Sequence, residues 1–588
     1  MRRTKIICTL GPAVDNEEIL KKLMLNGMDV ARMNFSHGTH EQHKKRIDMF
    51  KRVRDSLELP IALLLDTKGP EIRTGNFNEN NVVLKMGESF ILTPEDIAGD
   101  NTRTSITYKE LYKDVQKGNR ILIDDGLIEL EVVDIKNREI HCKVLNGGTL
   151  SNSKGINAPG VEIKLPSLTK QDIEDIRFGI ENEIDFVAAS FVRKAGDVEE
   201  IRKLLEKYKG DSIRIIAKIE NRQGILNSDE ILKVSDGIMI ARGDLGVEIP
   251  VEEVPIVQKM LIEKCFKKSK PVITATQMLD SMIRNPRPTR AEASDVANAI
   301  YDGTSAVMLS GETAAGKYPV ETLDMMTKII EKAESSIDYW NKFETVQFEM
   351  TPTVTNAICH ATCMTALDLN AASIIAVTKS GRTARMISRF RPECPIITIT
   401  VSPRVQRQLS LSWGVYPYLV KEAESTDELF EMGVEKALKS GLVKHGDLTV
   451  ITAGVPVGIS GTTNLLKVHI VGKVLVRGTG IGTGVMTGEL CVANTYEDAE
   501  KSFSDGDILV LPYTTNNMLP VLKRASAIIV EENDSSNHAS TVGLTLEIPV
   551  IIGAENATKI LKNGAVVTVD ADRGIVHCES TRPLNPKN

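Results

Sequence analysis

The feature that most constrains the fold is an alternation in the first part of the chain, where short apolar runs are each followed by an amphipathic helical pattern. Helical patterns such as EEILKKLMLNG and VEEIRKLLEKYK separate the runs. This alternation is typical of parallel α/β folds. We predict strands at residues 4–10, 28–36, 61–67, 185–192, 214–220, 237–243, 271–277 and 305–310. Eight strands of this kind close a (β/α)8 barrel, the TIM barrel.

Three further segments depart from the barrel pattern. Residues 70–166 alternate strands with turns and contain little helix, and hairpin signals stand at DDG and NGG, so we expect an inserted antiparallel β domain. A new α/β pattern begins at 343, and a Gly-rich segment, RGTGIGTGVMTGE, opens a last β-rich piece. That segment lacks the flanking strand and helix of a dinucleotide site. The predicted domains are 1–69 with 167–342, 70–166, 343–473 and 474–588.

Composition excludes several classes of partner and location. A net charge of −7 gives no reason to expect nucleic acid or an anionic membrane as a partner. No stretch approaches the roughly 18 apolar residues of a membrane span, and the apolar stretch at the start is too short for a signal peptide. The eight cysteines have no zinc-like spacing. We therefore expect a protein of the reducing cytoplasm.

Polar side chains gather at the carboxyl ends of the predicted strands, where barrel enzymes keep their reactive groups. Arg32, Asn34 and Ser36 are spaced by two and therefore point to one face of their strand. Lys218 and Glu220 share a face of IIAKIE in the same way. The other polar residues at strand ends are Asp66, Thr67, Glu71, Arg73, Arg242, Asp244, Thr274 and Thr276.

Charged residues on apolar strands need partners, because a lone buried charge is costly. One interpretation is an ion pair that only fixes the barrel interior. The other is a site for a polyanion with a metal, in which carboxylates hold a hard cation and Lys and Arg hold phosphate oxygens. Magnesium suits such a site, since it binds one or two carboxylates together with substrate oxygens. This combination of groups favours phosphoryl transfer.

Seven motifs resemble those of the pyruvate kinase family, in the order in which that family has them. They are TKIICTLGP, ARMNFSHG, LLDTKGPEIRTG, IIAKIENRQG, MIARGDLGVE, ITATQMLDSM and NPRPTRAEASDVANAIYDGTSAVMLSGETAAGKYP. The resemblance continues to about residue 473. It implies an allosterically regulated transfer of the phosphoryl group of phosphoenolpyruvate to ADP, giving pyruvate and ATP in the last step of glycolysis.

The resemblance assigns roles to the charged residues. Glu220 and Asp244 are expected to hold Mg2+ or Mn2+. Lys218 is the cation expected to follow the phosphoryl group, with Arg32 and Arg73 neutralising its other oxygens. Gly243 belongs to the turn that is expected to bind the substrate carboxylate through backbone N–H groups.

Potassium is the second cation that the resemblance implies. Its expected ligands all supply oxygen; they are Asn34, Ser36, Asp66 and the carbonyl of Thr67. A Glu at the place of Glu71 accompanies potassium dependence in the family, so we expect this chain to need K+.

Two further contacts come from the same resemblance. Thr276 is expected to help deliver a proton to the enolate of pyruvate through water. Lys154, with Arg73, resembles a nucleotide contact, although a solvated loop charge is the alternative for Lys154. The inserted domain, an antiparallel β-barrel in the family, would then be a lid that excludes water.

The loop that joins a strand to a helix in the third domain resembles the effector loop of regulated members. Its residues are Thr378, Lys379, Ser380, Gly381, Arg382 and Thr383. Hydroxyls and backbone N–H groups at a helix start can hold a phosphate, so a sugar phosphate or AMP is the expected effector. An ordinary capped helix is the alternative. The family also implies a homotetramer.

The tail from residue 474 resembles the mobile, swivelling phosphohistidine domain of phosphoenolpyruvate-using enzymes, through SSNHASTVGLTLEIPVIIGAENAT. Some bacterial pyruvate kinases carry such a tail, which implies a bacterial origin. His538 matches the phosphate-accepting position, but Asn537 stands where active relatives have a small hydroxyl or thiol residue. We therefore favour a structural or interface role for the tail over a phosphorylated His538.

Two other functions compete with the kinase. A lyase or aldolase on a related phosphoenolpyruvate/pyruvate barrel would share the metal carboxylates, but it would not need the lid, the potassium ligands and Lys218 together. A catalytically silent regulator that binds metabolites would allow the site to decay, whereas every expected catalytic position is occupied.

Overall fold

A computed structural model describes residues 2–339, 353–423, 425–455 and 463–578. It divides into two compact units. The first contains Met1–Cys359 and Thr378–Glu422, and the second contains His360–Val377 and Ala423–Asn588. Each unit is described by itself.

The eight predicted strands form a closed parallel barrel in the first unit, in the order β1-β17-β16-β15-β14-β13-β3-β2. The strands are β1 Lys5–Thr9, β2 Val30–Asn34, β3 Ala62–Asp66, β13 Phe186–Ala189, β14 Arg214–Ile219, β15 Gly237–Ala241, β16 Val272–Ala275 and β17 Ala306–Leu309. Every strand lies inside its predicted range, so the barrel prediction is confirmed.

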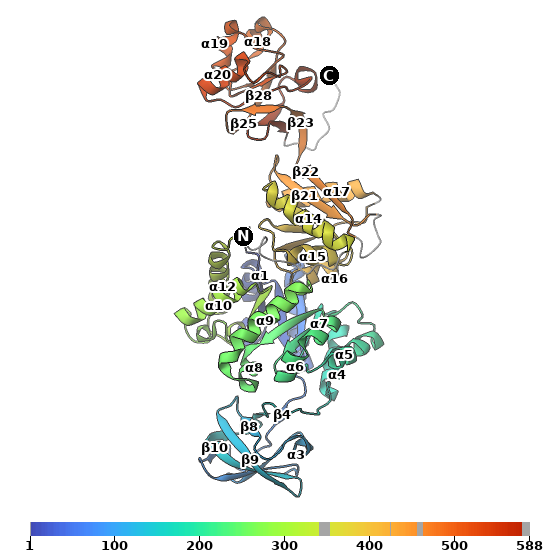
Figure 1. The fold of residues 1–588 in the computed structure, drawn as a ribbon, viewed down its shortest axis with the longest axis vertical. Helices are drawn as coiled ribbons and strands as arrows, with labels where there is room; N and C mark the ends of the chain where they lie inside the picture. Colours follow the sequence, from blue (N-terminus) through green and yellow to red (C-terminus); the bar gives the residue numbers. More distant parts are fainter. Residues whose placement is uncertain (1, 340–352, 424, 456–462, 579–588) are drawn as a thin grey trace. The chain divides into compact units, whose positions relative to one another are not determined.

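Helices follow the strands and cover the barrel (Figure 1). They are α1 Glu17–Leu25, α2 His40–Ser56, α4 Lys170–Glu181, α5 Ala195–Lys207, α6 Arg222–Leu226, α7 Ser228–Val234, α8 Arg242–Glu248, α9 Val254–Lys267, α10 Arg290–Asp302, α11 Gly311–Ala314 and α12 Pro319–Glu334. Side chains fix where several of them begin. Thr39 and Thr289, for example, each accept a hydrogen bond from the backbone three residues on, in a capping box.

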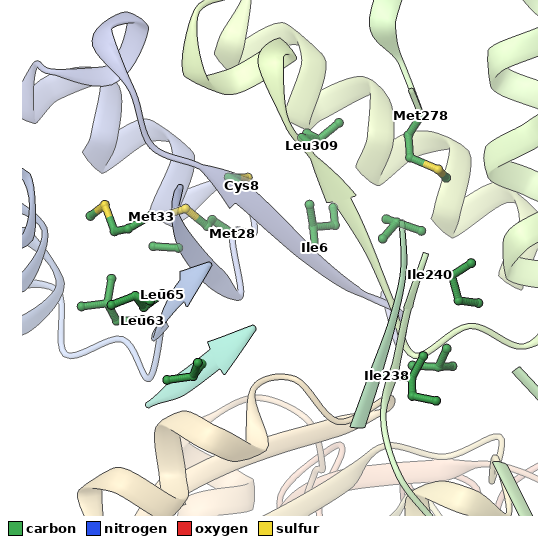
Figure 2. Close-up of a cluster of buried hydrophobic side chains, with 14 of the residues drawn as sticks. Ile6, Cys8, Met28, Met33, Leu63, Leu65, Ile238, Ile240, Met278 and Leu309 are labelled. Carbon is green, nitrogen blue, oxygen red and sulfur yellow. The ribbon is translucent and has the colours of Figure 1, made fainter. Parts of the chain in front are cut away.

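The two faces of the barrel strands bury different layers, because successive side chains in a strand alternate. Ile6 and Cys8 of β1 pack outward against helix residues such as Leu20, whereas Ile7 joins the residues inside the barrel. Figure 2 shows part of the outer layer, including Met28, Met33, Leu63, Leu65, Ile238, Ile240, Met278 and Leu309. Burial on both faces explains why the strands read as continuous apolar runs.

The inserted domain contains a seven-stranded sheet in the order β4-β12-β8-β9-β10-β6-β7. These strands are β4 Ile72–Arg73, β6 Ser89–Thr93, β7 Arg103–Ser105, β8 Arg120–Ile123, β9 Ile128–Lys136, β10 Glu139–Asn146 and β12 Gly155–Asn157. A bridge between Thr74 and Ile106 joins the two edges of the sheet, which gives it a barrel-like closure. Pairing is antiparallel except between β6 and β7, which run parallel.

Strands and helices of the predicted α/β segment occur in both units. In the first unit, β19 Ile396–Thr400 pairs in parallel with β20 Val415–Leu419, beside α15 Arg382–Arg389 and α16 Pro403–Leu409. In the second unit, β18 Ser373–Val377 pairs in parallel with β21 Leu448–Ala453, which pairs antiparallel with β22 Leu465–Ile470. The helix α17 Thr426–Lys439 contacts β18.

The last piece of the second unit has an eight-stranded sheet in the order β23-β30-β29-β25-β26-β27-β28-β24. Its strands are β23 Lys473–Arg477, β24 Thr479–Ile481, β25 Val485–Val492, β26 Ile508–Leu511, β27 Ala527–Val530, β28 Val550–Ile552, β29 Val566–Asp570 and β30 Ile575–Cys578. The Gly-rich segment enters β24, and a Cβ on Gly480 would lie 1.6 Å from the carbonyl of Ala571. Its glycines therefore allow close backbone approach.

Candidate active site

Four charged side chains meet at the carboxyl ends of neighbouring barrel strands. Arg32 Nε on β2 lies 2.6 Å from Asp66 Oδ2 on β3. Lys218 Nζ on β14 lies 3.1 Å from Asp66 Oδ1 and 2.9 Å from Glu220 Oε1. Asp66 and Glu220 are 0% and 1% exposed. The structure thus brings together four of the charged residues that the sequence placed on strands or at strand ends, as a connected network of alternating charge.

Two residues that the sequence analysis missed complete this network. Ser190 directly follows β13, which lies between β3 and β14. Its Oγ accepts a hydrogen bond from Lys218 Nζ at 2.7 Å and donates to the carbonyl of Thr67 at 2.6 Å. Phe191 has a left-handed backbone with a φ of 55°, and its N–H donates to Glu220 Oε2 at 2.6 Å. Both residues fix the directions of the charged groups.

The network sets the protonation of its members. Burial alone would lower the pKa of Lys218, but the charges of Asp66 and Glu220 raise it above its usual value. Burial would raise the pKa of Asp66, yet Lys218 and Arg32 outweigh burial and lower it. Lys218 is therefore an ammonium and Asp66 a carboxylate at neutral pH.

Glu220 and Asp244 are two carboxyl groups of the site whose pKa values are raised although Lys218 opposes the shift of both. Burial raises the pKa of Glu220 to about 7, with Asp244 adding to the effect and Lys218 opposing it. Burial also raises the pKa of Asp244, reinforced by Asp125 and Glu71. A bound cation would stabilise the ionised pair, so these residues fit a metal that uses two carboxylates. No group of three or more His, Cys, Asp or Glu residues is arranged for a metal among the described residues.

The four residues expected to bind potassium lie at the ends of β2 and β3. Asn34 pairs with Asp66 in the register of the two strands. Asn34 Oδ1 accepts from the Ser36 N–H at 3.1 Å, and the Thr67 carbonyl accepts from Ser190. The set supplies oxygens alone, which suits a large hard cation.

Thr276 lies beyond the end of β16 in a left-handed conformation, with a φ of 68°. Its Oγ1 accepts from the Gly243 N–H at 2.8 Å and donates to the Ala275 carbonyl at 2.6 Å. Arg242 supports this turn by donating to the Thr276 carbonyl at 2.9 Å and to Asp295 at 2.7 Å. The Gly243 N–H, assigned to the substrate carboxylate from the sequence, is thus hydrogen-bonded to Thr276 here.

A cleft of about 290 Å³ is lined by both the inserted domain and the barrel. Asp244 of the barrel faces it together with Arg73 and Lys154 of the inserted domain. Arg73 is paired with Glu71 at 2.5 Å, and Lys154 with Asp124 at 2.9 Å. Both cations line the cleft, and each is paired with a carboxylate. Their role as nucleotide contacts stays a prediction.

The expected effector loop precedes α15. Gly381 is the N-cap of this helix, with a φ of 77°, and its N–H donates to Thr378 Oγ1 at 3.0 Å. Arg385, one turn into the helix, donates to the Ser380 carbonyl at 3.2 Å. The loop is a tight turn, with Lys379 exposed in the turn and Arg382 exposed at the first position of α15.

The tail places His538 at the first position of α20 (His538–Leu546). Asn537 caps this helix by accepting from the Ser540 N–H at 2.8 Å. The Thr514 hydroxyl lies 3.0 Å from His538 Nδ1. Asn537 therefore has a structural role as the N-cap of this helix.

The comparisons with known proteins agree with this geometry. Family models described as "Pyruvate kinase, barrel domain", "Pyruvate kinase, alpha/beta domain" and "PEP-utilising enzyme, mobile domain" match residues 1–323, 356–469 and 503–574. The chain is 51% identical to a pyruvate kinase of Sporosarcina psychrophila over 98% of this chain and 99% of the relative. It is 52% identical to a pyruvate kinase of Geobacillus stearothermophilus over 98% of both chains. A solved pyruvate kinase of Cryptosporidium parvum superimposes with a TM-score of 0.77 and 40% identity, covering 80% of this chain and 96% of that one.

A closed (β/α)8 barrel with cations and carboxylates at its mouth defines a barrel enzyme that acts on an anionic substrate. The chain belongs to the pyruvate kinase family and is a phosphotransferase. These findings favour the kinase over the lyase and over the silent regulator. They also give the tail its place as a domain related to the mobile domain of PEP-utilising enzymes.

Proposed function

We propose that the chain transfers the phosphoryl group of phosphoenolpyruvate to ADP at the mouth of the barrel, with Mg2+ or Mn2+ and K+, as the last step of glycolysis in the cytoplasm. The observation that carries this proposal is the buried network of Arg32, Asp66, Lys218 and Glu220. No helix of the described residues is both long and apolar enough to cross a membrane.

Glu220 and Asp244 would hold the divalent ion, and Asn34, Ser36, Asp66 and Thr67 would hold potassium. The divalent ion, when bound, supplies positive charge to the substrate's carboxylate, enol and phosphoryl oxygens. The chain's own part is to orient the carboxylate of Glu220: the Phe191 N–H binds one of its oxygens, and Lys218 pairs with the other.

Lys218 and Arg32 would bind the phosphoryl oxygens and neutralise charge during transfer. Lys218 is suited to this because its ammonium stays protonated and its position is fixed by three hydrogen-bonding partners, Asp66, Glu220 and Ser190. Thr276 would pass a proton to the enolate through water, since its hydroxyl lies beside Gly243.

Arg73 and Lys154 would bind the nucleotide in the cleft lined by the inserted domain. Each would exchange its carboxylate partner, Glu71 or Asp124, for a phosphate oxygen. The inserted domain would act as a lid over the nucleotide. We further propose a homotetramer, a bacterial origin, and a sugar phosphate or AMP bound at Thr378–Thr383.

The test is pyruvate formation from phosphoenolpyruvate and ADP with magnesium, with and without potassium. We expect turnover that rises with potassium, and we expect Glu71→Lys to reduce that dependence because its ammonium would supply the missing positive charge. Turnover indifferent to potassium in the unaltered enzyme would discard the role given to Glu71. An absence of turnover in both buffers, even with sugar phosphates or AMP added, would discard the proposed reaction.

A further inference from the structure

A small cavity in the first unit is lined by cations and hydroxyl groups. It measures about 20 Å³ and lies among the connection from α9 to β16, the start of β17 and the helix α15. Its lining includes Lys270, Arg385, Arg389 and Arg391, together with four serines, and contains no Asp or Glu. We call it the arginine pocket. Lys270 donates to backbone carbonyls, including that of Ser235, and Arg385 donates to that of Ser380, so the argument for a ligand depends on Arg391.

Arg391 has hydrogen-bonding capacity that the described residues leave unused. Its Nη2 donates to the Gly303 carbonyl at 2.8 Å, and its guanidinium lies 4.6 Å from the centre of the Trp413 ring. Its Nε and Nη1 are buried and have no hydrogen-bond partner among the described residues. Burial lowers the pKa of Arg391 to about 9. Two orphaned N–H groups of a charged side chain are costly to bury, so a ligand that accepts from them would be stabilising.

The two acids whose charges act on the pKa values of Arg385 and Arg391 already have other partners. Glu334, which acts on Arg391, accepts from the Arg3 N–H at 2.8 Å and from the Thr4 N–H at 2.6 Å. Asp236, which acts on Arg385, is paired with two other arginines, Arg202 and Arg214, each at 2.7 Å. Neither Arg385 nor Arg391 forms an ion pair in the described part of the chain.

We infer that the arginine pocket binds a small oxyanion, either free phosphate or the phosphoryl group of a metabolite. The planar fork of a guanidinium matches two oxygens of such an anion, and serine hydroxyls can donate to the others. The small volume admits the anionic group alone, so any organic part would remain outside. None of the residues that line the pocket belongs to the barrel mouth or to the loop at Thr378–Thr383, although Arg385 donates to the Ser380 carbonyl of that loop. The oxyanion site does not depend on the reaction proposed above.

The chain provides its own reporter for this site. It contains two tryptophans, Trp340 and Trp413, and Trp413 lines the pocket. Trp340 lies outside the described residues. In Trp340→Phe, the remaining fluorescence comes from Trp413. We expect inorganic phosphate to change that fluorescence saturably, while chloride at equal ionic strength does not.

Paired variants in the Trp340→Phe background decide whether the response comes from this pocket. Arg391→Met keeps the stem on the indole but removes the fork, and Arg385→Gln removes a neighbouring charge; each should weaken phosphate binding at least about ten-fold. Lys379→Ala in the loop and Lys218→Ala at the barrel mouth should leave the response unchanged. A response that persists in both arginine variants, or that disappears in Lys379→Ala or Lys218→Ala, would overturn the inference, as would no response in Trp340→Phe.

A second titration separates the two sources of the anion. Glycerol phosphate is compared with inorganic phosphate in Trp340→Phe. Tighter binding of the ester identifies a metabolite's phosphoryl group, and equal or weaker binding identifies free phosphate. Either result supports an oxyanion site. If sodium acetate and sodium phosphate were equally effective, the response would be one of general ionic strength and the site would be rejected.

Discussion

Asp66 is the residue around which the barrel mouth is organised. Its carboxylate is fully buried, and each of its oxygens faces a different cation, Arg32 or Lys218. A buried carboxylate without such partners would cost several kcal/mol. The same pairing fixes the two cations that would contact the phosphoryl group. Structure and function therefore depend on the same ion pairs, which reconciles the two interpretations that the sequence left open.

Ser190 is a positioning residue whose role can be measured. We expect Ser190→Ala to lower kcat about ten-fold or more, because Lys218 loses one of three partners. The KM for phosphoenolpyruvate should change less than kcat, and Ser190→Thr should restore part of the rate. Ser235→Ala, a buried serine before β15, is the matched control and should leave kcat unchanged. Equal effects of the two alanine variants would reduce Ser190 to a packing role.

The spacing of two along a strand predicted which charged residues share a face, and the structure confirms the meeting of Arg32, Asp66, Lys218 and Glu220. Ser190 was missed because serine at a strand end has no periodic or charge signal. Its place after a strand that lies between β3 and β14 could have identified it, but only once the order of the strands was known.

Apolar runs and helical periodicity were sufficient to predict the strands of the barrel and the helices between them, but turn motifs did not predict every hairpin correctly. The DDG signal marks the hairpin between β8 and β9. The NGG prediction was wrong, because β10 and β11 (Gly148–Ser151) do not pair with each other, and β11 pairs with β5 (Asn81–Leu84). The hairpin between β9 and β10 turns at Asn137 and Arg138, which both have a positive φ. Asparagine tolerates a positive φ, but an arginine in the sequence does not indicate a turn.

Asp236, just before β15, forms ion pairs with residues of two other elements of the barrel. These pairs predict how the stability of the protein depends on pH. Burial would raise its pKa, but Arg214 on β14 and Arg202 on α5 outweigh burial and lower it. A carboxyl group whose pKa is lowered by folding stabilises the folded protein at pH values above its unfolded pKa, which is about 3.9 for Asp. This stabilisation is lost as the pH falls through the pKa of the folded state.

The corresponding variant is Asp236→Asn. At pH 7 it should be destabilised by about 2 kcal/mol, since two arginines lose their partner. The difference from the unaltered protein should shrink below about pH 4. Urea unfolding at pH 7, 5 and 3.5 measures it, with the exposed Asp229→Asn as control. A constant difference across this range would contradict the assigned ion pairs.

For the whole molecule, the four predicted domains stay a prediction, because the two compact units do not coincide with them. The first unit contains both the barrel and the inserted domain, and therefore every residue of the proposed active site. The tail lies in the second unit. Composition and periodicity could indicate a separate last piece, but they could not divide the α/β segment between units, because that division depends on long-range packing.

The tail leads to a prediction for the enzyme as a whole. We expect His538→Ala to leave turnover of phosphoenolpyruvate and ADP within about two-fold, because Asn537 caps α20 and no residue of the proposed barrel site lies in that unit. Steady-state assays of the full chain test this, with Asn537→Ala as a variant that should lower stability instead. A large loss of turnover in His538→Ala would indicate a phosphocarrier role.

The most direct test of the central claim is the effect of Lys218→Ala on rate and on binding of phosphoenolpyruvate, measured on the same preparation. Lys218 is held at the barrel mouth by Asp66, Glu220 and Ser190. We expect a fall in kcat of roughly 10²–10³-fold or more, with a much smaller change in the Kd for phosphoenolpyruvate, because the ammonium acts mainly in the transition state. A variant of an outer lysine, Lys264→Ala, should change neither. Equal losses of rate and of binding in Lys218→Ala, or an unchanged kcat, would contradict the account.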